Sequence, residues 1–425
     1  GYRGHVFWDT EIMMLPFFLF TQPHTARSLL GYRYHTLGGA RELARENGIR
    51  GAQYPWESAD TGREECPRFT PDGQNRFYTR DEELHVTADV AYAIVRYADV
   101  TGDVDYLYGE GAEILFETTR FWMQRCTRDG DRLVLHTVMG PDEFHSHVDN
   151  NAFTNRMVRW HLERAAQVHA RMAQTHPDAL AALAERIGLA AGEADGWADA
   201  AEQIVAPVDP DIGVIEQFDG YFERTVVPIT EWDENDMPRY PEGYDHFTCE
   251  DTSLLKQPDV VMLMFVLPND YSLRTRHANY EFYEPRTVHK SSLSPSIHAI
   301  VGLQVGDRTK AEQYFARSAY VDVDDNQGNT EEGMHIASAG GTWQIVTHGF
   351  GGFLATPDGL SFSPALPSSW DRVRFSVHWR GRTVRADLGH DDVLLELVGD
   401  GPDEVVTVWG ERIALTPGTP ATATR

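Results

Sequence analysis

The period of the hydrophobic pattern changes once along the chain, at Gly351-Gly352-Phe353. Before this point apolar residues recur every three or four positions, which is the spacing of one face of an α-helix. After it they alternate with polar residues, which is the spacing of a β-strand. We therefore expect a mainly α protein, with a helical domain over residues 1–355 and a small β-domain over residues 356–416.

Helical spacing is clearest in three runs of the first part. They extend from Leu84 to Ala98, from Ile114 to Trp122 and from Val158 to Met172, and Ala-rich helix formers continue toward Ile204. The connecting segments at roughly 50–80, 136–156 and 206–252 are rich in Gly, Pro, Asp and aromatic residues. Loops this long inside a compact domain usually carry function. The pattern indicates a toroid of helices whose long aromatic loops carry the functional site.

Strand spacing begins in the second part. Val373, Phe375, Val377 and Trp379 alternate with polar residues, and two similar runs follow. Turn residues between the runs predict antiparallel strands. Because so few strands make a marginal core alone, we expect half of a β-sandwich packed on the helical domain. Residues 417–425 are rich in Thr, Ala and Pro, so we expect a disordered tail.

Composition excludes several kinds of partner. The formal charge is -28, which repels nucleic acid and anionic membranes and requires any phosphate site to be a local basic pocket. Three scattered cysteines are too few for a disulfide framework and indicate reduced thiols. No apolar run reaches the roughly 18 residues that span a membrane. We expect a cytoplasmic protein.

One motif places a carboxylic acid in a sharp turn. Gly140-Pro141-Asp142-Glu143-Phe144-His145 surrounds Glu143 with His, Asn and aromatic neighbours. Partial burial and the nearby Asp142 carboxylate are expected to raise the pKa of Glu143 into the range of a general acid. A Gly-Pro-Asp run is by itself more often only a turn. Glu143 could then simply cap the following helix.

Five further segments join this motif in a recognisable order. All six together resemble glycoside hydrolase family 65, inverting α-glucoside phosphorylases that act on maltose, trehalose, kojibiose or nigerose. The resemblance implies an (α/α)6 barrel. It also implies an amino-terminal β-sandwich ahead of the first motif, and since the sequence opens inside that motif we expect the chain to lack it. The segments are Gly4–Glu11, Tyr54–Ala59, Gly140–His145, Lys256–Val261, Tyr283–Ser294 and Glu332–Trp343.

The resemblance implies roles for residues at the donor sugar. Glu143 would be the catalytic acid. Carboxylates accept paired hydrogen bonds from vicinal hydroxyls, and an indole offers an apolar platform to a sugar ring. The alternatives are a core tryptophan beside a helix-start Asp9, and a surface lysine at position 256. The residues placed around the sugar by resemblance are Trp8, Asp9, Lys256 and Gln257, with Trp56 and Glu57 lining the cleft.

The phosphate candidates lie in the last two motifs. Ser291, Ser292 and His335 supply donors, and paired glycines at 340 and 341 would let backbone N–H groups approach an anion. His289 either binds phosphate or orients its loop. Lys290 stands where the family usually has Asp, and it either adds positive charge or points to solvent. Arg286 is a possible second cation. The phosphate candidates by number are Ser291, Ser292, His335, Gly340, Gly341 and His289.

The choice between phosphate and water as nucleophile rests on a missing base. An inverting hydrolase needs a second carboxylate to activate water, and family hydrolases carry a Glu in the segment where this chain has no carboxylate between Arg286 and Leu303. We therefore expect inverting phosphorolysis of an α-glucosidic disaccharide to β-D-glucose 1-phosphate. An inverting hydrolase and a non-catalytic glycan-binding remnant are the alternatives, although a relic would have no reason to keep the five donor-site residues.

Few other partners are expected. The reaction needs inorganic phosphate as co-substrate and no cofactor or metal, and the histidines show no metal-ligand spacing. We expect a disaccharide as the partner, with neither nucleic acid nor membrane. The acceptor sugar and a homodimeric state are left open.

Overall fold

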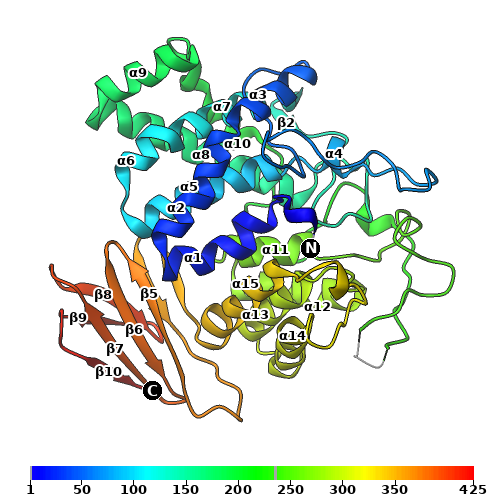
Figure 1. Cartoon of the computed structure of the whole chain (residues 1–425). Helices are drawn as coiled ribbons and strands as arrows, with labels where there is room; N and C mark the ends of the chain where they lie inside the picture. Colours follow the sequence, from blue (N-terminus) through cyan, green and yellow to red (C-terminus); the bar gives the residue numbers. More distant parts are fainter. Residues whose placement is uncertain (1, 234–236) are drawn as a thin grey trace.

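A closed ring of six inner helical segments forms the body of the protein. The computed structural model describes residues 2–233 and 237–425 (Figure 1). Each inner segment contacts the next around the ring, and the last one contacts the first. The segments are η2 (Thr10–Met14) continuing into α1 (Leu15–Thr21), α5 (Val86–Thr101), α8 (Ala152–Thr175), α11 (Asp259–Val266), α13 (Ser294–Val305) and α15 (Ile336–Gln344).

Outer helices alternate with the inner ones along the chain and pack against their outer sides. This arrangement is the predicted (α/α)6 barrel, and the prediction of a mainly helical fold is confirmed. The outer helices are α2 (Pro23–His35), α7 (Ala112–Arg125), α10 (Trp197–Gln203), α12 (Leu273–Tyr283) and α14 (Arg308–Tyr320). The remaining short elements are η1 (Tyr2–Gly4), α3 (Leu37–Glu46), α4 (Thr79–Glu82), α6 (Val104–Tyr106), η3 (Leu107–Gly111), β1 (Thr127–Asp129), β2 (Arg132–Val134), α9 (Pro177–Ile187), η4 (Glu193–Gly196), η5 (Tyr221–Glu223), η6 (Glu284–Arg286), η7 (Thr330–Glu332) and η8 (Ile345–Phe350).

The helix ends follow local signals in the sequence. Helix α5 stops at Gly102, whose φ of 76° is the left-handed conformation that glycine adopts without strain. Helix α8 begins at Asn151, whose side chain accepts a hydrogen bond from Thr154 N at 2.9 Å. The apolar face of α5 is buried in the core, including Ala88, Ala91 and Val95.

The ring closes where the last inner helix meets the first. Gln344 Nε2 in α15 donates to the carbonyls of Ile12 at 3.3 Å and Met13 at 3.0 Å. Gly340 lies against the same turn, where a Cβ atom would overlap the Met13 carbonyl. These contacts join residues from opposite ends of the helical domain.

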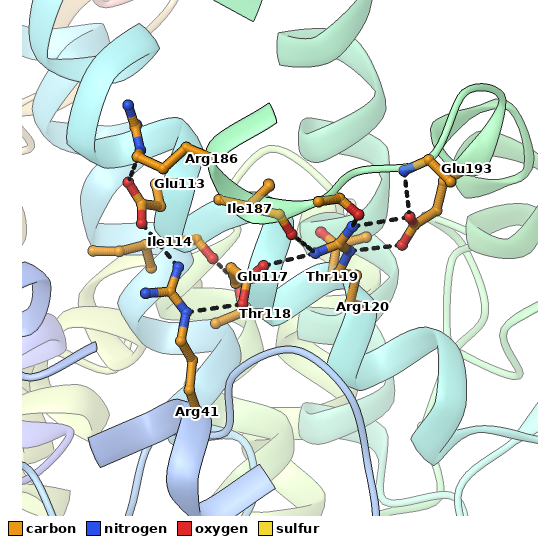
Figure 2. A network of polar contacts seen from close by, with 12 residues as sticks. Arg41, Glu113, Ile114, Glu117, Thr118, Thr119, Arg120, Arg186, Ile187 and Glu193 are labelled. Atoms are coloured by element: carbon orange, nitrogen blue, oxygen red, sulfur yellow. Dashed lines mark hydrogen bonds and ion pairs between the residues drawn. The ribbon is translucent and has the colours of Figure 1, made fainter. Parts of the chain in front are cut away.

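An ionic network joins the outer helix α7 to the short elements α3 and η4 (Figure 2). Arg41 of α3 donates to Glu113 at 2.8 Å and Glu117 at 3.0 Å, both on α7. Arg120 of α7 bonds Glu117 at 2.8 Å and Glu193 at 2.6 Å. A network of this kind stabilises more than isolated surface pairs do. The Glu117 carbonyl also accepts from Ala52 N at 2.9 Å, which anchors the segment that leads into the second motif.

The carboxy-terminal part is a β-sandwich of two four-stranded sheets, ordered β10-β7-β6-β5 and β3-β4-β8-β9. Both layers are present, so the expected half-sandwich is wrong. The trace also shows this domain beside the barrel (Figure 1). The strands are β3 (Leu354–Thr356), β4 (Gly359–Phe362), β5 (Val373–Trp379), β6 (Arg382–Leu388), β7 (Asp392–Val398), β8 (Glu404–Val408), β9 (Glu411–Leu415) and β10 (Ala421–Thr424).

Three further expectations for this domain need correction. Strands β4 and β8 pair in parallel, in an otherwise antiparallel domain, because the chain visits the other sheet between them. The tail at 417–425 was expected to be disordered, but it contains β10, which pairs with β7. Its alternating Ala and Thr residues supply backbone pairing and β-propensity despite a composition typical of disorder. The expected boundary at 355/356 lies inside β3.

No helix in the described ranges 2–233 and 237–425 has the length and apolar character needed to cross a membrane.

Candidate active site

The candidate residues meet because they stand just before the first turns of the inner helices. Asp9 precedes η2, Lys256 and Gln257 precede α11, and Ser292 precedes α13. The Glu143 loop leads into α8, and His335 is the N-cap of α15. Later turns of α1, α5, α8 and α11 line a cavity of about 200 Å³ at the other end of the barrel. The inner helices therefore direct their positive dipole ends to one face, which favours a bound anion.

Glu143 and Lys256 form an ion pair at the centre of this face. The Lys256 Nζ to Glu143 Oε1 distance is 2.6 Å, with 16% and 14% of the side chains exposed. Burial alone would raise the pKa of Glu143, but the Lys256 ammonium and its hydrogen bond hold that pKa below its usual value. The expected rise in the pKa of Glu143 is therefore wrong. The alternative of Lys256 as a surface lysine finds no support in this geometry.

Asp9 is a second carboxylate beside this pair. Burial and the negative charge of Glu143 raise the pKa of Asp9 to about 6, against the opposing effect of Lys256. Asp9 occupies the N-cap position of η2 without making a side-chain capping bond. Its carboxylate is thus held close to Glu143 and Lys256 rather than used as a helix cap.

Trp8 is mostly enclosed by protein. It is 2% exposed, and its ring meets the His85 ring edge-on with centroids 5.2 Å apart. The burial agrees with the alternative of a core tryptophan, so contact between Trp8 and a sugar stays a prediction.

Three buried ionisable residues beneath Trp8 were missed in the sequence. His85 Nδ1 lies 2.6 Å from Asp89 Oδ2, and His85 Nε2 lies 3.0 Å from Glu83 Oε1. Burial lowers the pKa of His85, but the two carboxylates outweigh it and raise that pKa to about 10. Burial and the charge of Glu143 raise the pKa of Glu83 to about 8 despite the His85 contact. The i, i+4 spacing of His85 and Asp89 was the available signal.

The second motif is joined to the first. Val6 N donates to the Ser58 carbonyl at 2.8 Å, and the Phe7 and Trp56 rings meet edge-on at 4.8 Å. Glu57 Oε1 lies 2.5 Å from His5 Nδ1. Glu64, which the sequence did not single out, accepts from Trp56 N at 2.8 Å and Glu57 N at 3.2 Å. Trp56 and Glu57 are therefore fixed by their backbone, and the Trp56 indole nitrogen is buried without a hydrogen-bond partner among the described atoms.

Gln257 has a structural contact that was not expected. It is 2% exposed, and its side-chain amide donates to the carbonyl of Pro141. Pro141 lies in the loop of residues 138–148 that carries Glu143, which we call the acid loop. Its Oε1 is buried and unpaired within the described part of the chain. Contact with the donor sugar stays a prediction.

The acid loop is closed at its base and strained at its edges. Val138 and Val148 exchange two backbone hydrogen bonds of 2.9 and 3.0 Å. Glu82 accepts from His147 N at 2.7 Å and lies 2.6 Å from His147 Nδ1. The left-handed φ values of Thr137 (52°) and His147 (57°) are unfavourable for residues with a side chain and are found at functional sites. The loop is held in one conformation.

His335 and the serine pair lie at neighbouring helix starts, because α13 and α15 contact each other. Asp322 Oδ1 lies 2.6 Å from His335 Nδ1, and Asp322 Oδ2 accepts from His335 N at 2.8 Å. The Nε2 atom is thereby the ring nitrogen left to meet a ligand. Ser291 Oγ accepts from Leu293 N at 3.2 Å, and both serines are partly exposed.

His289 is enclosed and fully engaged. Its Nδ1 lies 2.8 Å from Ser294 Oγ, its Nε2 lies 3.0 Å from the Tyr314 hydroxyl, and it is 1% exposed. Burial and neighbouring cations lower its pKa well below the usual value. Its φ of 51° bends the chain just before the serine pair. Of its two predicted roles, the geometry supports orientation of the loop and not phosphate binding.

Gly340 and Gly341 are packed inside α15. The helix uses their N–H groups in its own hydrogen bonds. A Cβ at Gly341 would lie 2.5 Å from Ser296 Oγ, and one at Gly340 would overlap the Met13 carbonyl. The geometry therefore does not support the expected backbone contact with an anion. Close helix packing is the physical reason for both glycines.

The two extra cations also have neighbours. Lys290 is partly buried, with Nζ 5.6 Å from the centre of the Tyr240 ring, and burial lowers its pKa. Arg286 stacks 3.8 Å above the Phe282 ring and donates to the Phe282 carbonyl. Arg286 thus stabilises the end of α12. An open pocket of about 340 Å³ adjoins Glu143 and is lined by Glu143, Phe144, His246, Phe247, Phe77 and Tyr78, among others.

The fold is of the (α/α)6-barrel class, followed by a β-sandwich. Two family models match it: the glycosyl hydrolase family 65 central catalytic domain over residues 1–344 and the family 65 C-terminal domain over residues 355–415. The chain belongs to glycosyl hydrolase family 65.

Relatives within the family carry phosphorylase names. A kojibiose phosphorylase from Caldanaerobacter subterraneus subsp. tengcongensis is 46% identical over 421 residues, 98% of this chain and 55% of that protein. An alpha,alpha-trehalose phosphorylase from Thermoanaerobacter brockii is 37% identical over 98% of this chain and 53% of that protein. A solved structure named "Putative kojibiose phosphorylase from human microbiome" has a TM-score of 0.89 at 29% identity and covers 100% of this chain and 55% of that one. The chain spans about half the length of the relatives it matches.

Proposed function

We propose that this protein catalyses inverting phosphorolysis of an α-linked glucose disaccharide, giving β-D-glucose 1-phosphate and the acceptor sugar. The Glu143–Lys256 pair carries the proposal, because it places a carboxylic acid on the face where the helix starts offer hydroxyl and imidazole groups. The names of the relatives support it, and the 46% identity to a kojibiose phosphorylase makes kojibiose the first substrate to test.

In this reaction Glu143 gives a proton to the leaving oxygen while phosphate attacks the opposite face of the anomeric carbon. Glu143 is paired with Lys256, so it must carry a proton before it can act as the acid. When a sugar hydroxyl binds the Lys256 ammonium in place of Glu143, Glu143 stays buried but loses its ion pair. The pKa of Glu143 then rises, because burial without a cation favours the neutral carboxyl.

Phosphate would lie at the starts of α13 and α15. Ser291, Ser292 and His335 donate to it there, and two helix dipoles add favourable potential. Phosphate serves as the nucleophile itself, so the reaction requires no cofactor and no second carboxylate. Asp9, with Trp56 and Glu57, would hold the glucose hydroxyls.

An inverting hydrolase and a non-catalytic glycan-binding protein are the competing functions. The test incubates the purified protein with kojibiose, trehalose, maltose and nigerose, with and without phosphate, and follows products by proton NMR. Phosphorolysis predicts β-glucose 1-phosphate only when phosphate is present. Phosphate-independent release of free glucose at a comparable rate would establish the hydrolase, and sugar binding without turnover would establish the binding protein.

The setting of the reaction is part of the proposal. All three cysteines are free thiols, which is usual in a reducing cytoplasm. The partners would be the small sugars and phosphate, with neither nucleic acid nor membrane, and a homodimer stays open. Static light scattering of the purified protein decides the oligomeric state.

A further inference from the structure

The Asp142 carboxylate makes more hydrogen bonds than its neighbour Glu143. Asp142 is 1% exposed. Its Oδ1 accepts from Lys256 N at 2.7 Å, and its Oδ2 lies 2.6 Å from His145 Nδ1 and accepts from Gln217 Nε2 at 3.0 Å. The carboxylate therefore joins the acid loop to two segments distant in sequence.

These bonds connect the backbones of the two residues at the centre of the site. Glu143 follows Asp142 directly, and Asp142 Oδ1 holds the backbone N–H of Lys256. The Asp142 N–H is itself fixed by Asp259 Oδ1 at 2.6 Å. The separation of the Glu143 carboxyl and the Lys256 ammonium thus depends in part on Asp142, whose carboxylate bonds neither group. The bonds of Gln257 to the Pro141 carbonyl and of Asp259 to Asp142 N join the same two segments.

The protonation of His145 follows from its two partners. His145 Nδ1 faces the Asp142 carboxylate, and Nε2 lies 2.8 Å from the Thr252 carbonyl oxygen. Both partners are acceptors, so both ring nitrogens carry a proton. The carboxylate of Asp142 raises the pKa of His145 against the effect of burial. Asp142 and His145 are then a buried ion pair whose net charge is zero.

We infer that Asp142 is a positioning residue, which acts on the reaction only by holding the backbones of Glu143 and Lys256 in register. The inference rests on the proposed function, because it assigns Asp142 to that chemistry. It predicts that kcat depends on the hydrogen bonds that Asp142 makes and not on its negative charge. A misplacement of about 1 Å at reacting groups can cost on the order of 100-fold in rate.

Two substitutions separate geometry from charge. In Asp142→Asn the amide oxygen still accepts from Lys256 N, while the amide nitrogen donates to a neutral His145. Gln217 can rotate its amide, because its Oε1 is buried and unpaired among the described atoms. Asp142→Ala removes every one of these bonds. We expect Asp142→Asn to keep kcat on the disaccharide within about 10-fold, and Asp142→Ala to lose on the order of 100-fold with little change in KM.

A second substrate excludes a general loss of folded enzyme. α-Glucosyl fluoride has a good leaving group that needs little protonation, so misplacement of the acid should matter less. The loss in Asp142→Ala must therefore be several times smaller on the fluoride than on the disaccharide. Equal losses on both substrates, or an Asn variant as damaged as the Ala variant, would overturn the inference. If Asp142→Ala does not fold, Asp142→Asn alone tests the inference. Its kcat, relative to the wild type, is then measured on the disaccharide and on the fluoride.

Asp149→Asn is the matched control. Asp149 lies in the same loop region, is 43% exposed at its side chain, and accepts from Thr137 N at 2.9 Å. It should keep wild-type kinetics.

If the wild-type protein acts on none of the sugars, the proposed function fails while the inference is decided by crystal structures of the variants. The Glu143–Lys256 distance should stay near 2.6 Å in Asp142→Asn and lengthen in Asp142→Ala. An unchanged distance in Asp142→Ala overturns the inference.

Discussion

At the residue scale, the properties of Glu143 depend on groups that come close only after folding. Its carboxyl is 2.6 Å from an ammonium that lies 113 residues away in sequence. An acid in this position has to exchange its partner before it can donate a proton. The ion pair therefore represents the resting state of the site.

Glu143→Gln tests the proton donation. The amide keeps the shape and a hydrogen bond with the sugar but has no proton to give. We expect turnover of the disaccharide to fall by about 10²–10⁴-fold, while calorimetry shows a disaccharide Kd close to that of the wild type. α-Glucosyl fluoride should be affected less. A Gln variant with near-wild-type kcat on the disaccharide would reject Glu143 as the acid.

Lys256→Met tests the control of the acid's pKa. The kcat/KM of a general acid falls when pH rises through the pKa of that acid in the free enzyme. Lys256 lowers the pKa of Glu143, whereas burial raises it. Removal of the ammonium leaves burial dominant, so the basic limb of the profile should move to higher pH. The measurement is a pH profile of kcat/KM at saturating phosphate. A limb that stays in place or moves to lower pH contradicts the assignment, and a Glu143→Gln background should lack the limb.

His335 and His289 should respond differently to replacement by alanine. His335→Ala, like the double change Ser291→Ala with Ser292→Ala, removes a donor to a charged ligand, at a cost of roughly 1–3 kcal/mol. Initial-rate kinetics should show a higher phosphate KM and an unchanged disaccharide KM. His289→Ala instead removes the contacts of the imidazole with Ser294 and Tyr314 and leaves a cavity in the core, so it should lower Tm. A normal Tm for His289→Ala would return that residue to the phosphate candidates.

At the element scale, the last strand gives the clearest prediction. Strand β10 covers one edge of β7, and its removal leaves backbone groups of β7 unpaired. Deletion of residues 420–425 should lower Tm by about 2–4 °C for each kcal/mol lost. The kinetics at 25 °C should not change, because the site is built at the starts of the inner helices. Thr422→Ser keeps the strand pairing and serves as the control. An unchanged Tm in the deletion would show that β10 adds no stability.

The elements also show what could be predicted from sequence. Helix α5 followed from its apolar spacing and from Gly102, which are local signals. The parallel pairing of β4 with β8 depends on chain segments more than 40 residues apart in sequence, so strand spacing alone could not predict it. The position of Glu143 in a turn was readable, but the direction of its pKa shift was not, because Lys256 comes close only in the folded chain. Composition misled at β10, where a short paired strand has the residues of a flexible tail.

At the scale of the whole molecule, a strongly acidic protein has to hold an anion. The formal charge of -28 opposes phosphate everywhere at long range. The convergence of the inner helix starts provides a local positive potential that needs few lysines or arginines. The same ring lets the predicted site residues that lie in loops vary while the helices beneath them stay unchanged.

The contact between Gln344 and Met13, which closes the ring, can form only late in synthesis. These residues are 331 positions apart. A ribosome adds about 5–20 residues per second, so Met13 emerges roughly 15–65 s before its partner. During that interval Leu15 and Leu19, each 2% exposed in the finished protein, lack their final packing. The first inner helix therefore reaches its final packing only when the last inner helix has been made, and the candidate site is completed at the same time.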